Sequence, residues 1–169
     1  MDTPEPKVSF SSFLAKFPEI ELPLTVAEDS ARNFSLQNEP LSSAAIRQYI
    51  PDELEEEDEE LTEYVPCFKI PNTGEVRAVV YWKASLLNYE YVMATYTKVG
   101  KPLARKTIAG TVVTADGIIV QSVATIDSDW IIYIASGKSA TGEDGSYDAS
   151  TSRTHVLELL ANGMIVSSS

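Results

Sequence analysis

Four glycine-containing turns recur along the later part of the chain, and they constrain its fold more than any other feature of the sequence. In each of them a glycine directly follows the turn residues. Glycine readily adopts the positive φ angle that a type I turn with a G1 bulge requires, and such turns join antiparallel strands. Their spacing sets no fixed period, so they predict a series of hairpins rather than tandem repeats. The four turns are PNTGEV (71–76), TKVGKPL (97–103), TADGIIV (114–120) and LANGMIV (160–166).

Runs of β-branched and aromatic residues lie between these turns from Tyr64 onward, as is typical of strands. We therefore predict a mainly β (α+β) fold, an antiparallel up-and-down meander that forms either an open barrel or a curved sheet. Two short N-terminal helices are expected to cover one face or end of it. A further tight turn is predicted at 127–129. The predicted strands lie near 64–70, 75–84, 89–97, 103–109, 111–114, 118–126, 130–136, 153–160 and 164–168.

Two of the predicted strands carry patterns that indicate how they are buried. Along 75–84, apolar residues alternate with Glu75, Arg77 and Lys83, so this strand is predicted to be half-buried. The run WIIYIA at 130–135 is apolar at both alternating sets of positions. We therefore expect it to be a central strand that is covered on both faces.

The front of the chain differs from the rest, because prolines divide it into short segments. In residues 9–17, four apolar side chains recur at helical spacing, and Ser9 stands before them as a cap. Residues 20–26 alternate apolar and polar positions, which predicts a short edge strand. Residues 41–50 predict a second short helix, capped by one of the two serines at positions 42 and 43.

The segments FSSFLAKFPEIELPLTV, AEDS and NEPLSSAAIRQYIP all belong to this front. In these segments the chain resembles the N-terminal part of a group of small uncharacterised bacterial proteins. The resemblance covers roughly the first fifty residues, and its motifs are hydrophobic and proline-spaced. It implies no established activity, so it assigns no functional residue to this chain.

The chain is predicted to form a single domain over 1–169, made of the front (1–50), an acidic connector (51–63) and the β-meander (64–169). With 44% hydrophobic and 22% charged residues, it can build an ordinary globular core. One cysteine and one histidine exclude an internal disulfide and a Cys/His zinc site within one chain. No signal peptide or long apolar segment is visible, so we expect a soluble cytoplasmic protein without a membrane partner.

The connector, PDELEEEDEELTE, holds nine acidic residues and no basic one. The net charge is −12, yet outside this segment the 16 acidic residues exceed the 13 basic ones by only three. This near-neutral remainder argues against nucleic-acid binding, which needs a basic surface. The segment is either a solvated connector, since blocks of like charge usually stay disordered, or a docking element for a basic protein partner. The candidate binding residues within it are Glu55, Glu56, Glu57, Asp58, Glu59 and Glu60.

Two loop-like segments suggest ligand chemistry but do not match the patterns that such chemistry requires. SGKSATG (136–142) lacks the earlier glycine and the following helix of a phosphate-binding loop. The acids of TGEDGSYD (141–148) lack the alternating ligands of a calcium loop. We predict a long polar loop over 137–151 instead. The sequence therefore assigns no cofactor and no metal.

Catalytic side chains would need a fold that brings them together. Cys67 and His155 form a nucleophilic pair only under that condition, and a core cysteine and a rim histidine are the simpler reading. Glu90 and Glu158 are candidates for paired hydrolytic carboxylates only if they are buried. The sequence assigns no catalytic residue, which favours a function without catalysis.

Tyr89 and Tyr91 share one face of a predicted strand. Exposed together, they would form a ligand-stacking surface or the centre of a partner interface; otherwise they pack within the sheet.

Two functional hypotheses follow. The first is a non-enzymatic soluble binding protein that presents the acidic segment to a basic protein partner. The alternative is a small-molecule binding or hydrolytic site in a curved β-sheet with dispersed carboxylates.

Overall fold

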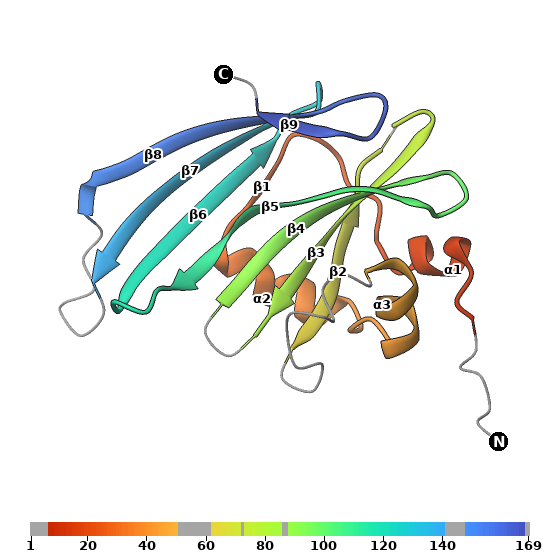
Figure 1. Ribbon diagram of the computed structural model, residues 1–169, viewed down its shortest axis with the longest axis horizontal. Helices are drawn as coiled ribbons and strands as arrows, with labels where there is room; N and C mark the ends of the chain where they lie inside the picture. The colour runs from red at the N-terminus through yellow and green to blue at the C-terminus, as the bar shows by residue number, and fades with distance from the viewer. Residues whose placement is uncertain (1–6, 51–61, 72, 86–87, 141–147, 168–169) are drawn as a thin grey trace.

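The computed structural model describes residues 7–50, 62–71, 73–85, 88–140 and 148–167. Their strands form one antiparallel sheet in which each strand from β2 to β9 pairs with the next along the chain. The sheet is strongly curved, and its end strands β2 and β9 are not paired with each other in the described part (Figure 1). The predicted up-and-down meander is thus confirmed as a curved, unclosed sheet. Its strands are β2 (Glu63–Lys69), β3 (Val76–Ala84), β4 (Asn88–Thr97), β5 (Pro102–Val113), β6 (Ile118–Ile126), β7 (Ile131–Ala140), β8 (Asp148–Leu159) and β9 (Ile165–Ser167).

The predicted turns are confirmed. All four turn glycines have positive φ angles, between 69° and 95°. The turn between β6 and β7 is held by the Asp127 side chain, whose Oδ1 accepts the backbone N–H groups of Asp129 at 2.9 Å and Ile131 at 3.0 Å. Local turn chemistry therefore sets the hairpins of the meander, as the sequence indicates.

Two strand boundaries differ from the prediction. The segments 103–109 and 111–114 form one strand, β5, which passes through Gly110 without a break. The predicted long loop over 137–151 is wrong, because β7 continues to Ala140 and β8 begins at Asp148. Cross-strand hydrogen bonding extends this hairpin although its residues are small and polar, a composition that by itself is typical of loops.

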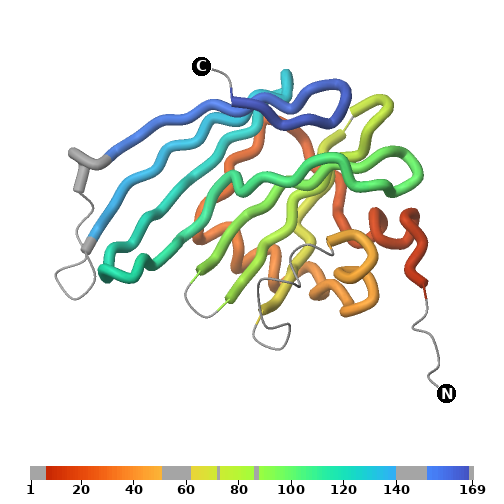
Figure 2. The backbone as a smooth tube through the Cα atoms, in the orientation of Figure 1, coloured from red at the N-terminus to blue at the C-terminus, as the bar shows by residue number. Residues whose placement is uncertain are grey.

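The sheet forks between β5 and β6. These strands pair only between Gly110–Val113 and Ile119–Ser122. Beyond the fork, β6 pairs instead with β1 (Leu24–Val26), which comes from the front of the chain and lies beside β6 in the backbone trace (Figure 2). At the fork Gly110 has φ 151°, and a Cβ atom there would lie 2.1 Å from the carbonyl oxygen of Tyr89. Only glycine permits this close approach of β5 to β4.

The two predicted N-terminal helices are present. Ser9 Oγ accepts the Ser12 backbone N–H at 3.1 Å and so caps α1 (Phe10–Ala15). Ser42 Oγ accepts the Ala45 backbone N–H at 3.2 Å and caps α3 (Ser43–Tyr49). Of the two serines that the sequence left open, Ser42 is the cap.

A third helix, α2 (Glu28–Gln37), was not predicted. Its residues are mostly polar, and only Ala31 is fully buried, with Phe34 half-buried one turn later. The local signals are weak: two acidic residues in the first turn, and Ser30 Oγ accepting the Ala27 backbone N–H at 3.2 Å. Packing on the sheet therefore contributes to this helix in a way that propensity does not reveal.

Two separate cores cover the two faces of β2–β4. The sheet core joins one face of these strands to α2 and to β5–β8, and the helix core joins the other face to α1 and α3. The sheet core consists of Val26, Ala31, Cys67, Phe68, Ile70, Ala78, Val80, Tyr91, Met93, Ile108, Ala109, Ala124, Ile126, Ile132, Leu157 and Leu159. The helix core consists of Phe13, Phe17, Leu41, Ala45, Ile46, Ile50, Tyr64, Val79, Tyr81, Val92, Ala94 and Tyr96.

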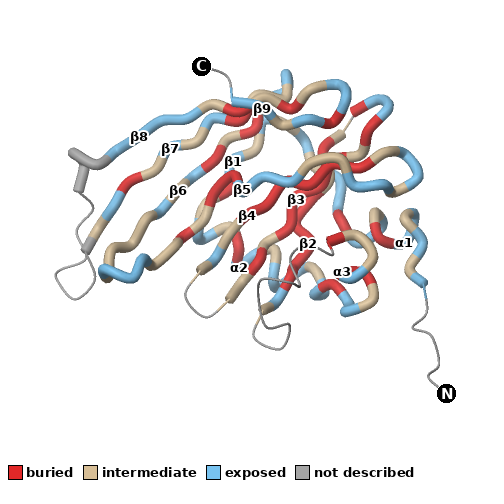
Figure 3. Tube along the Cα trace, in the orientation of Figure 1, coloured by how far each residue is buried: buried red, intermediate tan, exposed pale blue. Residues whose placement is uncertain are grey.

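This arrangement corrects both burial predictions. The strand over 75–84 is not half-buried: Val79 and Tyr81 are fully buried on its second face, and even Lys83 is only 6% exposed. The run WIIYIA is not covered on both faces, because Tyr133 is 48% exposed. Buried positions gather on β2–β4, whereas β7 and β8 are largely exposed or intermediate (Figure 3). The packing of α1 and α3 on β2–β4 therefore determines which strands are covered on both faces.

The front also closes the outer edge of β2. The Leu41 N–H donates to the Tyr64 carbonyl at 2.7 Å, and the Lys69 N–H donates to the Pro18 carbonyl at 2.9 Å. Asn38 Nδ2 donates to the carbonyl oxygen of Pro66 at 2.7 Å. These bonds satisfy backbone groups that an edge strand otherwise leaves open.

Among the described residues, no helix has the length and apolar character needed to cross a membrane.

Candidate functional site

A hollow of about 350 Å³ lies between α2 and the sheet. Its wall on the helix side is formed by Glu28, Ala31 and Arg32, and its wall on the sheet side by side chains of β3, β4 and β5. Gly110 and Thr111 contribute from β5 at the fork of the sheet. The hollow therefore exists because α2 crosses the sheet at the point where β5 and β6 separate.

Two aromatic rings line the sheet side. Trp82 of β3 and Tyr89 of β4 stack with their ring centroids 5.7 Å apart and their planes at 13°. They are diagonal neighbours, because Trp82 pairs with Tyr91 and Ala84 pairs with Tyr89 across the two strands. Trp82 is half-buried and Tyr89 is 38% exposed, so the pair keeps an aromatic surface open to the hollow.

Tyr91 lies in the same hollow but plays a different part from Tyr89. Its side chain is only 1% exposed, and its hydroxyl donates to the carbonyl oxygen of Ala27 at 2.7 Å. Burial raises the pKa of this hydroxyl above its ordinary value. The two tyrosines are therefore not exposed together: Tyr91 ties the start of α2 to the sheet, and Tyr89 faces solvent beside Trp82.

The rim carries one charge of each sign from successive turns of α2. Glu28 and Arg32 stand four residues apart, so they share one face of the helix. Glu28 Oε2 accepts Gln121 Nε2 of β6 at 2.9 Å, which holds the carboxylate against the sheet. Within the described part of the chain, the Arg32 guanidinium makes no hydrogen bond or ion pair, so its donors remain open to a ligand.

A second hollow of about 380 Å³ adjoins the first and shares Glu28 and Thr111 with it. It continues along the first turn of α2 past Asp29 to Gln121 of β6. Tyr89, Thr111 and Gln121 are cross-strand partners in one row, so they lead from one hollow into the other. We call the joined hollows the α2 groove; its main side chains are Glu28, Arg32, Trp82, Tyr89, Thr111 and Gln121.

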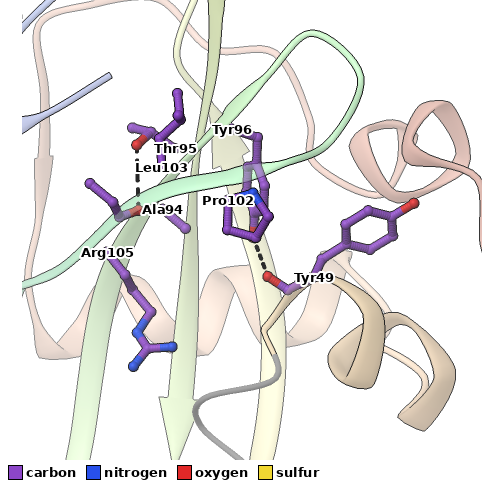
Figure 4. Close-up of a pocket in the computed structure, with 8 residues that line it drawn as sticks. Tyr49, Ala94, Thr95, Tyr96, Pro102, Leu103 and Arg105 are labelled. Atoms are coloured by element: carbon purple, nitrogen blue, oxygen red, sulfur yellow. Dashed lines mark hydrogen bonds between the residues drawn. The ribbon is translucent and has the colours of Figure 1, made fainter. Parts of the chain in front are cut away.

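A separate hollow of about 370 Å³ lies between the β4–β5 hairpin and the end of α3 (Figure 4). Its polar groups are already engaged. The Tyr96 hydroxyl donates to the Tyr49 carbonyl oxygen at 2.9 Å (Figure 4). Thr95 Oγ1 donates to the Gly163 carbonyl oxygen at 2.6 Å. Arg105 also has an interaction partner. These hydrogen bonds hold the β4–β5 hairpin in place. This hollow therefore offers a ligand fewer available polar groups than the α2 groove does.

The remaining candidates from the sequence are dispersed. Cys67 is fully buried and its thiol donates to the Val65 carbonyl oxygen at 3.6 Å, whereas His155 is exposed on β8 with its Nε2 3.2 Å from Ser167 Oγ. Burial raises the pKa of the Cys67 thiol, which opposes formation of a thiolate. The structure thus gives these two residues different neighbours and does not join them as a pair.

The carboxylate candidates are likewise separate. Glu90 lies on β4 opposite Lys83 of β3, and Glu158 lies on β8 opposite Ile131 of β7. Both carboxylates are half-buried, and neither belongs to the fully buried residues. The acidic candidates Glu55, Glu56, Glu57, Asp58, Glu59 and Glu60, and likewise Glu143 and Asp144, lie outside the described residues.

Metal and phosphate sites receive no support from the described part of the chain. It contains no cluster of three or more His, Cys, Asp or Glu side chains that could hold a metal ion. The start of SGKSATG, residues 136–140, belongs to strand β7, whose register against β8 shifts between Ser136 and Lys138. A strand cannot wrap its backbone N–H groups around a phosphate as a glycine-rich loop does.

Sequence reasoning missed the helix side of the α2 groove, because it placed no helix at residues 28–37. The sequence signal for this helix was the four-residue spacing of Glu28 and Arg32, with Ala31, which is buried in the structure, between them. Comparison with known proteins adds no residue to the site, since no family model, no curated protein and no solved structure matches the chain.

Proposed function

We propose that the chain is a non-enzymatic binding protein and that the α2 groove is its ligand site. The observation that carries this proposal is the open, nearly parallel pair of Trp82 and Tyr89 inside a concave, charged rim. Aromatic surface combined with a few placed polar groups is the usual composition of a ligand site. The proposal takes up the alternative hypothesis from the sequence, a small-molecule site in a curved β-sheet, and keeps the non-enzymatic character of the first hypothesis.

The bonds within the groove favour binding over catalysis. Glu28 is held by Gln121, and the Tyr91 hydroxyl is held by the Ala27 carbonyl oxygen. A general acid or base has to exchange its proton with a substrate, whereas these groups are committed to joining α2 to the sheet. Arg32 is the polar group best placed to meet a ligand.

A ligand-observed NMR screen with a chemically diverse set of small molecules tests the proposal. Molecules that bind wild type are expected to lose their signal with Tyr89→Ala, because this change removes half of the aromatic pair. Tyr133→Ala is the matched control, since Tyr133 is another exposed tyrosine and lies on β7 outside the groove. Ligands that bind the Tyr89→Ala variant as well as wild type would contradict the proposal.

A second binding role concerns the acidic segment. We propose that residues 51–63 attract a basic protein partner, because they carry nine of the chain's acidic side chains and no basic one. Concentrated charge raises association rates and makes them sensitive to salt. In a pull-down, a variant with the acids of 53–60 changed to their amides is expected to lose salt-sensitive partners. Identical partners with the same salt dependence would refute this role. A cytoplasmic location stays a prediction from the sequence.

A further inference from the structure

We propose that the α2 groove binds a neutral carbohydrate of at least two sugar units. This inference rests on the proposed binding function and specifies the ligand class of the same site. Three properties of the groove support it: the parallel aromatic rings, the mixed donors and acceptors of its rim, and the second hollow that adjoins the first.

The aromatic pair suits the apolar face of a sugar ring. A pyranose exposes C–H groups on its ring faces and hydroxyl groups around its edge. Trp82 and Tyr89 stack with their centroids 5.7 Å apart and their planes at 13°, so they offer parallel ring faces rather than crossed rings. C–H groups pack favourably on such electron-rich faces, while the amphipathic character of Trp and Tyr tolerates the water around the ring edge.

The rim matches hydroxyl groups because it supplies both halves of their hydrogen bonds. A hydroxyl both donates and accepts, so a sugar needs acceptors and donors side by side. Glu28 can accept through Oε1, the oxygen that Gln121 does not use. The Arg32 guanidinium, which has no partner among the described residues, can donate, and the Thr111 hydroxyl can do either. A ligand without hydroxyl groups would leave part of this set unused.

The charges of the groove favour a neutral ligand. Glu28 and Arg32 contribute one charge of each sign, and Asp29 adds a second negative charge at the adjoining hollow. An anionic ligand would meet these carboxylates and a chain of net charge −12, whereas a cationic one would meet Arg32 at the aromatic end. Neutral hydroxyl groups avoid both repulsions.

The length of the groove favours more than one sugar unit. The aromatic hollow of about 350 Å³ lies beside the second hollow of about 380 Å³, and the two share Glu28 and Thr111. The adjoining hollow is lined by polar side chains such as Asp29, Gln121 and Ser122. One unit would stack on the aromatic pair while the next hydrogen-bonds in this polar part.

The indole signals of the two tryptophans provide the test. Neutral disaccharides with glucose, galactose, xylose or N-acetylglucosamine units are titrated into ¹⁵N-labelled protein, and Trp82→Phe assigns the two indole N–H signals. At least one disaccharide is expected to shift the Trp82 signal saturably, and the matching monosaccharide to bind more weakly. The Trp130 signal should stay in place, because Trp130 lines a different hollow near the β6–β7 turn.

Variants then connect binding to the proposed contacts. Trp82→Ala or Tyr89→Ala is expected to weaken disaccharide binding about tenfold or more, which corresponds to about 1.4 kcal/mol for the lost ring contact. Arg32→Gln, which keeps hydrogen-bond donors without the charge, should weaken it less than Arg32→Ala. Tyr133→Ala should bind as wild type does.

Benzoate, an aromatic anion, and choline, a cation, are titrated in parallel. They separate failure of the carbohydrate inference from failure of the proposed function. If they shift the Trp82 signal and no disaccharide does, the carbohydrate inference is overturned while the groove remains a ligand site. If no probe from the panel or from the wider screen depends on Tyr89, both the inference and the proposed function fail.

Discussion

Replacing Gly110 by alanine tests the central feature of this fold, the close contact of β5 with β4 where the sheet forks. A Cβ atom at Gly110 would lie 2.1 Å from the Tyr89 carbonyl oxygen and 2.9 Å from the Glu90 Cα. Both atoms belong to the backbone of a neighbouring strand, so they cannot move aside as the end of a flexible side chain can. The backbone angle φ of 151° adds conformational strain for any residue with a Cβ atom.

The expected loss follows from these two contributions. Backbone strain of this kind costs about 1–3 kcal/mol, and forcing atoms into a filled space costs about 1–3 kcal/mol more. We therefore expect Gly110→Ala to lower the free energy of unfolding by roughly 4 kcal/mol, from a total that is about 5–15 kcal/mol in typical proteins. Since Tyr89 belongs to the aromatic pair, the same change should also disturb the α2 groove.

Gly74→Ala is the matched control. Gly74 also has a positive φ, 69°, but a Cβ atom there would meet nothing within 4 Å. Gly74→Ala should lower the free energy of unfolding by about 1–2 kcal/mol, because only the left-handed backbone conformation opposes the alanine. Urea unfolding followed by circular dichroism gives both values by linear extrapolation. Equal losses for the two variants would refute the claim that the approach of β4 requires glycine at Gly110.

Two further predictions concern the attachment of the helices. Ser42→Ala should lower the free energy of unfolding by about 1 kcal/mol, because the α3 cap is lost, while Ser43→Ala in the same urea assay should change it little. Equal losses would show that the assigned cap is wrong. Tyr91→Phe should cost about 1 kcal/mol at neutral pH through the bond to Ala27. Because burial raises the pKa of Tyr91, its neutral form stabilises the native state, and this contribution falls as the pH rises above about 10. Urea midpoints measured across this range should therefore decline less steeply in Tyr91→Phe than in wild type; equal slopes would contradict the assignment.

The local features of the fold were predictable because their causes lie within a few residues of the chain. The turn glycines have the positive φ angles that their turns need, and Asp127 closes the β6–β7 turn through its own side chain. The caps of α1 and α3 are serines directly before the first helical residue. Alternating apolar runs between such turns can form little other than an antiparallel meander.

The burial of each strand face was not predictable, because it depends on which distant segment covers that face. Val79 and Tyr81 are buried only because α1 and α3 pack over β3, whereas Tyr133 is exposed because no described segment covers it. Strand patterns record how apolar a face is, but they do not record which helix reaches it.

The candidate site depends still more on tertiary structure. Tyr89 could be singled out from the sequence, but its stacking on Trp82 follows from the register of β3 against β4. Glu28 and Arg32 reach the groove because α2, a helix with weak local signals, is tied to the sheet by the Tyr91 hydroxyl. The sequence by itself determined the hairpins through local backbone chemistry. The groove required contacts between residues more than sixty positions apart, such as Ala27 with Tyr91, and only the folded chain brings these together.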